Sequence, residues 1–206
     1  GQLEEVITQA NILIEQFPKT AILHNILGSA NAGLGQLYVA ITSYNRALKI
    51  DPDYAEAHNN LGNAMLKKGD LTAAIRNFNH ALKINPNYVE AHYNLGNVLK
   101  QKGDQSAAIK SYQRTITINP DYVAAHNNLG NALKETGDLT RAIQSYNRAI
   151  EIKPDFTEAH SNLGAAHKET GDLTRAIESY KRAIQINSDF TEAHNNLGNA
   201  LKELGD

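Results

Sequence analysis

The stretch AHNNLGNALKETGD, residues 125–138, holds the pattern that decides the fold. Close copies of it return along the chain as AHNNLGNAMLKKGD (57–70), AHYNLGNVLKQKGD (91–104), AHSNLGAAHKETGD (159–172) and AHNNLGNALKELGD (193–206). Their glycines follow a constant step, so that Gly96, Gly130 and Gly164 are 34 residues apart. A fixed period between about 20 and 50 residues is typical of a solenoid built from stacked structural units.

Each period predicts two helices separated by a glycine. The first is expected to begin near Ala55 with Asp53 as its N-cap, because a short acidic side chain accepts hydrogen bonds from the free N–H groups of a first turn. Gly69 is expected to end this helix, as a glycine just past a helix terminus does. Asp70 then caps a second helix, which Pro86 stops.

Small residues on the facing sides of the two helices predict close packing. Gly62 on the first helix and Ala74 on the second let the helices approach, while Phe78 and Leu82 are expected to fill the space around them. One helix pair cannot bury both of its apolar faces, whereas stacked neighbours can, so stability grows from the interfaces between units. The residues therefore predict an all-α chain of stacked, antiparallel helix pairs.

This pattern resembles the tetratricopeptide repeat (TPR), whose 34-residue motif reads W-x2-L-G-x2-Y, then A-x3-F, A and P. Within residues 123–156 the matching positions are His126, Leu129, Gly130, Leu133, Ala142, Tyr146, Ala149 and Pro154. The sequence departs from the motif by a histidine for the tryptophan, by the lack of a tyrosine at position eleven, and by Thr115 and Ser188. These departures keep the packing role of each position.

The resemblance covers the whole chain and implies its organisation. It implies a right-handed α-solenoid, or superhelix, of about 12 helices with a 34-residue period. We expect a single TPR solenoid over residues 1–206, with a second helix at 1–20 and a first helix at 191–206. The complete repeats between them are expected at 21–54, 55–88, 89–122, 123–156 and 157–190.

The composition argues against several functional classes. The net charge of −2 lacks the basic excess of proteins that bind nucleic acids. The chain has no cysteine and no apolar run near the ~18 residues of a membrane span. Because no phosphate-binding loop, nucleophile elbow or metal-ligand cluster is visible, we predict a chain that is not an enzyme and needs no cofactor. The predicted location is soluble and cytoplasmic, without membrane insertion.

The first helices carry regular polar residues on the side turned away from their partner helix. Each repeat is counted from its first helix, so that Ala55 is position 1, and this side holds positions 2, 5, 6, 9, 12 and 13. In TPR proteins the first helices line a concave groove. Asparagine offers one acceptor and two donors, so it suits the backbone of an extended peptide. The position-6 asparagines are similar to the ladder in the TPR superhelix of O-linked N-acetylglucosamine transferases.

We therefore predict a non-catalytic interaction module that binds an extended segment of a protein or peptide partner. Its position-5 asparagines are expected on the groove surface, while Ile26 breaks the ladder near the N-terminus. The predicted peptide-binding residues are Asn59, Asn60, Asn63, Asn94, Asn97, Asn127, Asn128, Asn131, Asn162, Asn195, Asn196, Asn199, Tyr93, Lys100, Lys134 and Lys168.

Other interpretations of these residues stay open. The asparagines at positions 6 and 9 are also consistent with bonds between neighbouring helices. The array could be the substrate-presenting arm of a larger enzyme, such as a glycosyltransferase, or a structural array that self-associates end to end through uncapped terminal helices. The repeated histidines, such as His126, are interpreted as half-buried aromatic residues. Repeats about 10 Å apart could not share a metal ion at the ~2 Å that ligation needs.

Overall fold

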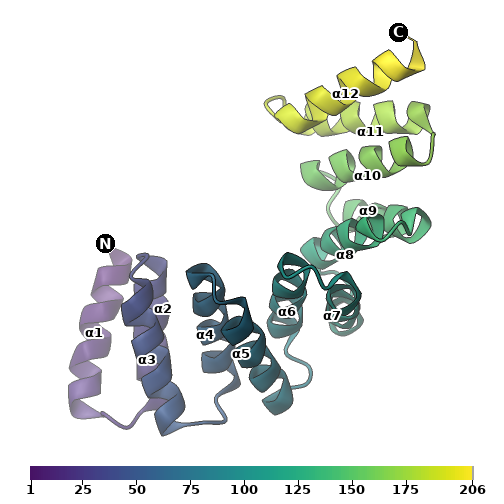
Figure 1. The fold of residues 1–206 in the computed structure, drawn as a ribbon. Helices are drawn as coiled ribbons and strands as arrows, with labels where there is room; N and C mark the ends of the chain where they lie inside the picture. Colours follow the sequence, from purple (N-terminus) through teal and green to yellow (C-terminus); the bar gives the residue numbers. More distant parts are fainter. Residues whose placement is uncertain (206) are drawn as a thin grey trace. The chain divides into compact units, whose positions relative to one another are not determined.

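A computed structural model describes residues 1–205 and divides the chain into two compact units, residues 1–102 and 103–206. Each unit is described by itself. Helices are the regular elements throughout residues 1–205 (Figure 1). Within this range the helices lack the combination of length and apolar character that a bilayer-spanning segment needs.

The first unit contains six helices, which alternate between second and first helices of the repeat. Each one packs against the next along the chain. Their bounds are α1 (Gln2–Gln16), α2 (Ala21–Gly33), α3 (Leu37–Ile50), α4 (Ala55–Lys68), α5 (Leu71–Ile84) and α6 (Val89–Gln101).

The second unit repeats this order. Consecutive helices are again in contact from its first helix to its last. Their bounds are α7 (Gln105–Ile118), α8 (Val123–Glu135), α9 (Leu139–Ile152), α10 (Thr157–Glu169), α11 (Leu173–Ile186) and α12 (Thr191–Leu204).

The helix ends are set by the residues that the period repeats. Gly69 follows α4 in the left-handed conformation, with φ of 86°, and the side chain of Asp70 accepts a hydrogen bond from the N–H of Ala73 at the start of α5. The prediction that Asp53 caps α4 is wrong, because the N-cap is Tyr54 and no side chain bonds the first turn. The N–H of Asp53 instead binds the Asp51 carboxylate inside the connecting loop.

Within each unit the first helices lie closer together than the second helices. In the first unit α2 contacts α4 and α4 contacts α6, and in the second unit α8 contacts α10 and α10 contacts α12. Within the described residues of either unit, the second helices make no such contact with one another. The face formed by the first helices is therefore the inner, concave side of each unit.

In the helix pairs that lie within one unit, the core is a glycine covered by an aromatic ring. A Cβ built on Gly62 would lie 2.6 Å from the ring of Phe78, and one on Gly130 would lie 2.5 Å from the ring of Tyr146. Both rings are fully buried. Real Cβ atoms do not approach a ring this closely, so only glycine permits the spacing between the two helices.

We expect Gly130→Ala to destabilise the chain by about 1–3 kcal/mol, because the added methyl group overlaps the Tyr146 ring in a packed core. Gly198 is the matched control, since it holds the same position in α12 and a Cβ there would meet nothing within 4 Å. Gly198→Ala should stabilise its helix by up to about 1 kcal/mol. Chemical denaturation of the two variants measures both effects, and equal shifts would contradict the packing argument.

Alkaline pH should weaken the fold through the buried tyrosines. Burial raises the pKa of Tyr180 to about 12, and the nearby carboxylates of Glu169 and Glu192 add to the effect. Because the unfolded phenol loses its proton first, near pH 10, the stability from the neutral ring is complete below pH 10. It is lost as the pH rises towards 12. In denaturation measured between these pH values, Tyr180→Phe should fall in stability less steeply than the parent chain.

Candidate functional site

The predicted site residues divide into three groups by their exposure. Asn59 and Asn127 at position 5 are buried, although their helical spacing predicted a place on the groove surface. Asn195 and Asn199 on α12 are exposed, because no further first helix packs over them within residues 1–205. The remaining residues are half-buried on the inner face, namely Asn60, Asn63, Asn94, Asn97, Asn128, Asn131, Asn162, Asn196, Tyr93, Lys100, Lys134 and Lys168.

The buried asparagines form an amide seam between consecutive first helices. The seam consists of the position-6 amide of one repeat donating to the position-5 amide oxygen of the repeat before it, 35 residues earlier. Asn162 Nδ2 donates to Asn127 Oδ1 at 3.0 Å across α10 and α8. The other bonds of the seam join Asn60 to Asn25 and Asn94 to Asn59, each at 3.1 Å. Position 5 is therefore used for packing between repeats.

The seam is broken where position 5 is a serine. Ser161 is 1% exposed, and its hydroxyl has no hydrogen-bond partner among residues 1–205. The next position-6 residue, Asn196, lies half-buried on α12. A serine side chain is shorter than an asparagine side chain, which explains why no bond closes between α10 and α12 at this point.

The hydrogen bonding of the position-9 side chain depends on the aromatic residue of the second helix in the same repeat. The hydroxyl of Tyr146 donates to Asn131 Oδ1 at 2.8 Å, and that of Tyr44 donates to Ser29 Oγ at 3.3 Å. In the repeat at 55–88 the ring belongs to Phe78, which has no hydroxyl. Asn63 consequently makes no hydrogen bond within residues 1–205.

Asn63 lines a polar cavity of about 290 Å³ between α2 and α4. Ser29, Asn60 and Lys67 also face this cavity. Asn60 Nδ2 donates to Ser29 Oγ at 3.5 Å, in addition to its bond in the amide seam. Ser29 Oγ thus accepts two hydrogen bonds and keeps its own hydrogen for a further partner. Helical spacing places Ser29 at position 9 and Lys67 at position 13 on this side of the first helices. Neither was among the predicted binding residues, since neither follows the residue type of its position in the other repeats.

Two of the predicted lysines are paired with glutamates of the following repeat. Lys134 Nζ lies 3.2 Å from Glu169, and Lys168 Nζ lies 3.2 Å from Glu203. Exposed pairs of this kind contribute about 0–1 kcal/mol. The two glutamates offset the positive charge of the lysines. The net positive charge available to a binding partner is therefore smaller than the sequence suggested.

Glu56, at position 2 of α4, lies on the inner face of the first unit and is bound to a seam asparagine. Asn25 Nδ2 donates to Glu56 Oε1 at 2.9 Å and to the hydroxyl of Tyr54 at 3.3 Å. Burial raises the pKa of Tyr54, and the neighbouring Glu56 carboxylate raises it further. This cluster fixes the position-2 glutamate against the seam, so its carboxylate is partly used inside the chain.

The repeated histidines anchor the loops that precede their helices. In each case Nε2 donates to the backbone carbonyl six residues earlier, and this fixes which ring nitrogen carries the hydrogen. The distances are 3.1 Å for His24 and Pro18, 3.0 Å for His58 and Pro52, 2.9 Å for His92 and Pro86, 2.8 Å for His126 and Pro120, 3.0 Å for His160 and Pro154, and 2.8 Å for His194 and Ser188. The sequence predicted a packing role for these histidines and did not predict the bond. The constant spacing of six residues between the carbonyl and the histidine is the signal that could have revealed it.

The comparisons with known proteins agree with this architecture. A family model described as a TPR repeat matches residues 28–69, 65–103, 96–137, 130–171 and 167–205. The chain belongs to the TPR family. The predicted class, an all-α solenoid of helix pairs, is thereby confirmed. TPR proteins are generally non-catalytic modules that bind other proteins. No curated protein matches the chain by sequence.

Several solved TPR structures resemble the chain. YrrB, described as a TPR protein with an unusual peptide-binding site, is 25% identical with a TM-score of 0.77, over 90% of this chain and 96% of YrrB. MamA is 28% identical with a TM-score of 0.75, over 81% of this chain and 97% of MamA. A thermophilic TPR protein of Thermus thermophilus shares the fold at 23% identity, with a TM-score of 0.64 over 88% of this chain and 99% of that protein.

The amide seam predicts that position-5 asparagines differ in how much they contribute to stability. We expect Asn127→Ala to destabilise the chain by about 1–3 kcal/mol, because it leaves the half-buried Asn162 amide without its acceptor. Asn195→Ala, at position 5 of α12, should change stability by less than about 0.5 kcal/mol, since that side chain is exposed. Denaturant unfolding compares the two, and a similar loss in both would contradict the seam.

The reverse substitution supplies a second check. Ser161→Asn places an amide oxygen where Asn25, Asn59 and Asn127 have theirs, within reach of Asn196. The new bond should stabilise the contact between α10 and α12 by about 1 kcal/mol. The effect should disappear when Asn196→Ala is added, and a gain that persists in the double variant would assign it to another cause.

Proposed function

We propose that the chain is a non-catalytic interaction module whose first-helix face binds an extended peptide segment of a partner protein. Membership of the TPR family supports the general role of binding proteins. The observation that carries the finer proposal is the polar cavity of the first unit, where the Asn63 amide has no partner within residues 1–205. A half-buried amide without a partner inside the chain is suited to hydrogen bonds with a ligand.

The chemistry of the cavity suits the backbone of a peptide. The Asn63 carboxamide offers one acceptor and two donors, so it can bond the C=O and the N–H of the same extended residue. The Ser29 hydroxyl and the Lys67 ammonium add donors beside it. Both nitrogen-bound hydrogens of Asn60 have acceptors in Asn25 and Ser29, which leaves the Asn60 oxygen as an acceptor towards the ligand. Recognition would then rely on main-chain groups and be tolerant of peptide sequence.

The seam limits which asparagines take part. Position-5 residues such as Asn59 and Asn127 are buried and act through the packing of the repeats. Direct contacts with the peptide are assigned to positions 6 and 9 and to the lysines at position 12. YrrB supports this proposal, because it shares the fold at 25% identity and is described as having a peptide-binding site.

Asn63→Ala should weaken peptide binding about ten-fold or more without lowering stability, because Asn63 makes no bond within residues 1–205. The probe is a peptide selected on the parent chain from a random display library, with affinity measured by fluorescence polarisation. Asn79→Ala is the matched control, since Asn79 is an exposed asparagine on the second helix α5. An affinity that is the same in the Asn63 and Asn79 variants would reject the site.

A second variant tests the same cavity without deleting the amide. Phe78→Tyr adds the hydroxyl that Tyr146 directs at Asn131 in the equivalent repeat. It should engage Asn63 and weaken peptide binding while leaving the fold intact. A peptide methylated on its backbone nitrogens should also bind less tightly, and unchanged binding of that peptide would count against recognition of the main chain.

A further inference from the structure

A cavity of about 320 Å³ lies in the first unit between the carboxyl-terminal parts of α1 and α3. It contains two cationic side chains, Arg46 and Lys49 from α3, and no carboxylate lines it among residues 1–205. Neither cation has a hydrogen bond or an ion pair inside the described part of the chain. The other residues that line this basic cavity are Ile14, Pro18, His24 and Ile50.

The equivalent place in the repeat at 123–156 shows what such an arginine binds. Arg148 corresponds to Arg46, three periods later in the sequence. Its Nη2 lies 3.2 Å from Asp121 Oδ1, and its Nη1 lies 3.1 Å from Glu151 Oε2. Asp121 comes from the loop before α8, and Glu151 comes from α9. This place in the repeat therefore brings one loop residue and two residues of the second helix together, with carboxylate oxygens on both nitrogens of the guanidinium.

Both carboxylates are replaced by lysines at the basic cavity. Lys19 occupies the position of Asp121, and Lys49 occupies that of Glu151. Three positive charges therefore stand where the later repeat has one positive and two negative charges. Like charges on one helix face, such as Arg46 and Lys49 at i and i+3, repel one another. A bound anion would remove this repulsion.

The buried side of the basic cavity holds a further polar group. His24 lines the cavity and is 4% exposed. Its Nε2 donates to the Pro18 carbonyl at 3.1 Å, whereas its Nδ1 has no partner among residues 1–205. Buried polar atoms without a partner are uncommon in folded proteins and can mark the place of an ion or a water molecule. The wall of the cavity thus keeps a hydrogen-bonding group that the chain itself does not use.

The basic cavity occurs at a regular place of the repeat. An equivalent cavity of about 550 Å³ lies one repeat later, beside α5, where the preceding helix pair of α2 and α3 is complete. Its lining residues include Asp53 and His80, at the positions of Lys19 and Arg46. The space is thus a feature that this part of the repeat produces by itself, whereas the concentration of positive charge distinguishes the first of the two cavities.

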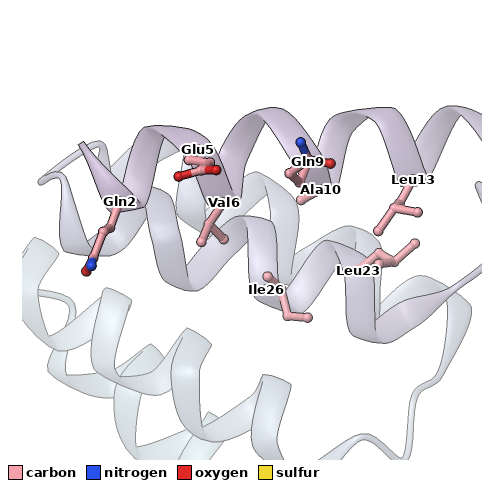
Figure 2. Close-up of a pocket in the computed structure, with 8 residues that line it drawn as sticks. All are labelled: Gln2, Glu5, Val6, Gln9, Ala10, Leu13, Leu23 and Ile26. Atoms are coloured by element: carbon pink, nitrogen blue, oxygen red, sulfur yellow. The ribbon is translucent and has the colours of Figure 1, made fainter.

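The apolar groove of the first unit has a different origin. Figure 2 shows Val6 and Leu13 pointing from α1 towards α2, where Leu23 and Ile26 face them. In a complete repeat, this space against a second helix holds the first helix of the same repeat, as α8 lies against α9. The groove therefore follows from the order of the helices and gives no indication of a ligand.

The charge of the basic cavity fits a phosphate group. A phosphomonoester carries a charge of about −1.5 to −2 near pH 7 and three acceptor oxygens, so it can replace the two carboxylates that bind Arg148. Arginine binds phosphate oxygens through two parallel N–H groups, and lysine adds a point charge. We propose that the basic cavity binds a phosphomonoester, with its phosphate group on Arg46, Lys19 and Lys49. The carbon part of the ligand lies against the apolar side of the cavity, which is formed by Ile14, Pro18 and Ile50.

The basic cavity is separate from the polar cavity that is proposed to bind a peptide. No residue lines both cavities. Phosphate binding therefore does not rest on the function proposed above, and each site can be tested without the other.

Three small anions test the basic cavity by isothermal titration calorimetry of the whole chain in a phosphate-free buffer. Phenyl phosphate is the expected ligand, phenyl sulfate has a similar shape with a single negative charge, and inorganic phosphate lacks the ring. Phenyl phosphate should bind at least about ten-fold more tightly than phenyl sulfate, because its second charge faces three cations. It should also bind at least about three-fold more tightly than inorganic phosphate, because its ring meets the apolar side of the cavity.

A double variant restores the ion pairs of the later repeat. Lys19→Asp with Lys49→Glu places around Arg46 the residue types that surround Arg148, so the fold is kept and the guanidinium is paired inside the chain. Binding of phenyl phosphate should fall at least about ten-fold. Arg46→Gln, which removes the guanidinium without adding a carboxylate, should weaken binding to a similar extent.

A matched control makes the same change of net charge elsewhere. Lys110→Glu with Lys181→Glu alters two exposed residues of α7 and α11 that lie outside the basic cavity. Binding of phenyl phosphate should change by less than about two-fold, because salt screens distant exposed charges. Thermal unfolding followed by circular dichroism shows that each variant is folded.

Four results would overturn the proposal. Binding that survives in the double variant of Lys19 and Lys49 would place the phosphate group elsewhere on the chain. An equal loss in the Lys110 and Lys181 control would assign binding to overall charge. Equal affinity for phenyl sulfate would reject a site for two negative charges, and equal affinity for inorganic phosphate would reject the contact with the apolar side of the cavity.

Discussion

The contact between a first-helix glycine and an aromatic ring is the constraint on which the other contacts depend. Because the ring occupies the place of a missing Cβ, the two helices of a pair come close enough for further bonds. The same Tyr146 ring that covers Gly130 directs its hydroxyl at Asn131. Where the ring is Phe78, the packing is kept and the hydroxyl is lost. A change of one atom in the core thus decides whether an amide on the inner face is engaged.

The asparagines of the repeat have a structural use that explains their density in a helix. Asparagine costs up to about 0.7 kcal/mol relative to alanine at each helical position. A hydrogen bond such as that between Asn162 and Asn127 contributes about 1 kcal/mol and satisfies an amide that would otherwise be buried alone. The seam therefore offsets much of the cost of its own residues. The proposed peptide binding uses the asparagines that the seam leaves accessible to a ligand.

Much of the fold could be predicted from the sequence because its signals are local and recur with the period. The start of α4 at Ala55, the turn at Gly69 and the packing of Gly62 on Phe78 each follow from residues close together in the chain or in one helix pair. The capping role of Asp53 was mispredicted because the nearby Asp51 carboxylate takes its N–H in a loop whose geometry the residue types do not reveal.

The partners of the inner-face residues could not be predicted. Helical spacing places Asn127 and Lys134 on a face, but only the angle between neighbouring repeats decides that Asn127 is buried under Asn162 and that Lys134 reaches Glu169.

The hydrogen bonds of the seam and of the histidines join residues that are 35 and 6 positions apart. Contacts of such short reach require little loop closure before they form, which favours rapid folding that can start in any repeat. A further period of 34 residues that carries asparagine at positions 5 and 6 could therefore be inserted with the hydrogen bonds of the seam kept. Duplication of a repeat can then change the length of the array by one unit at a time.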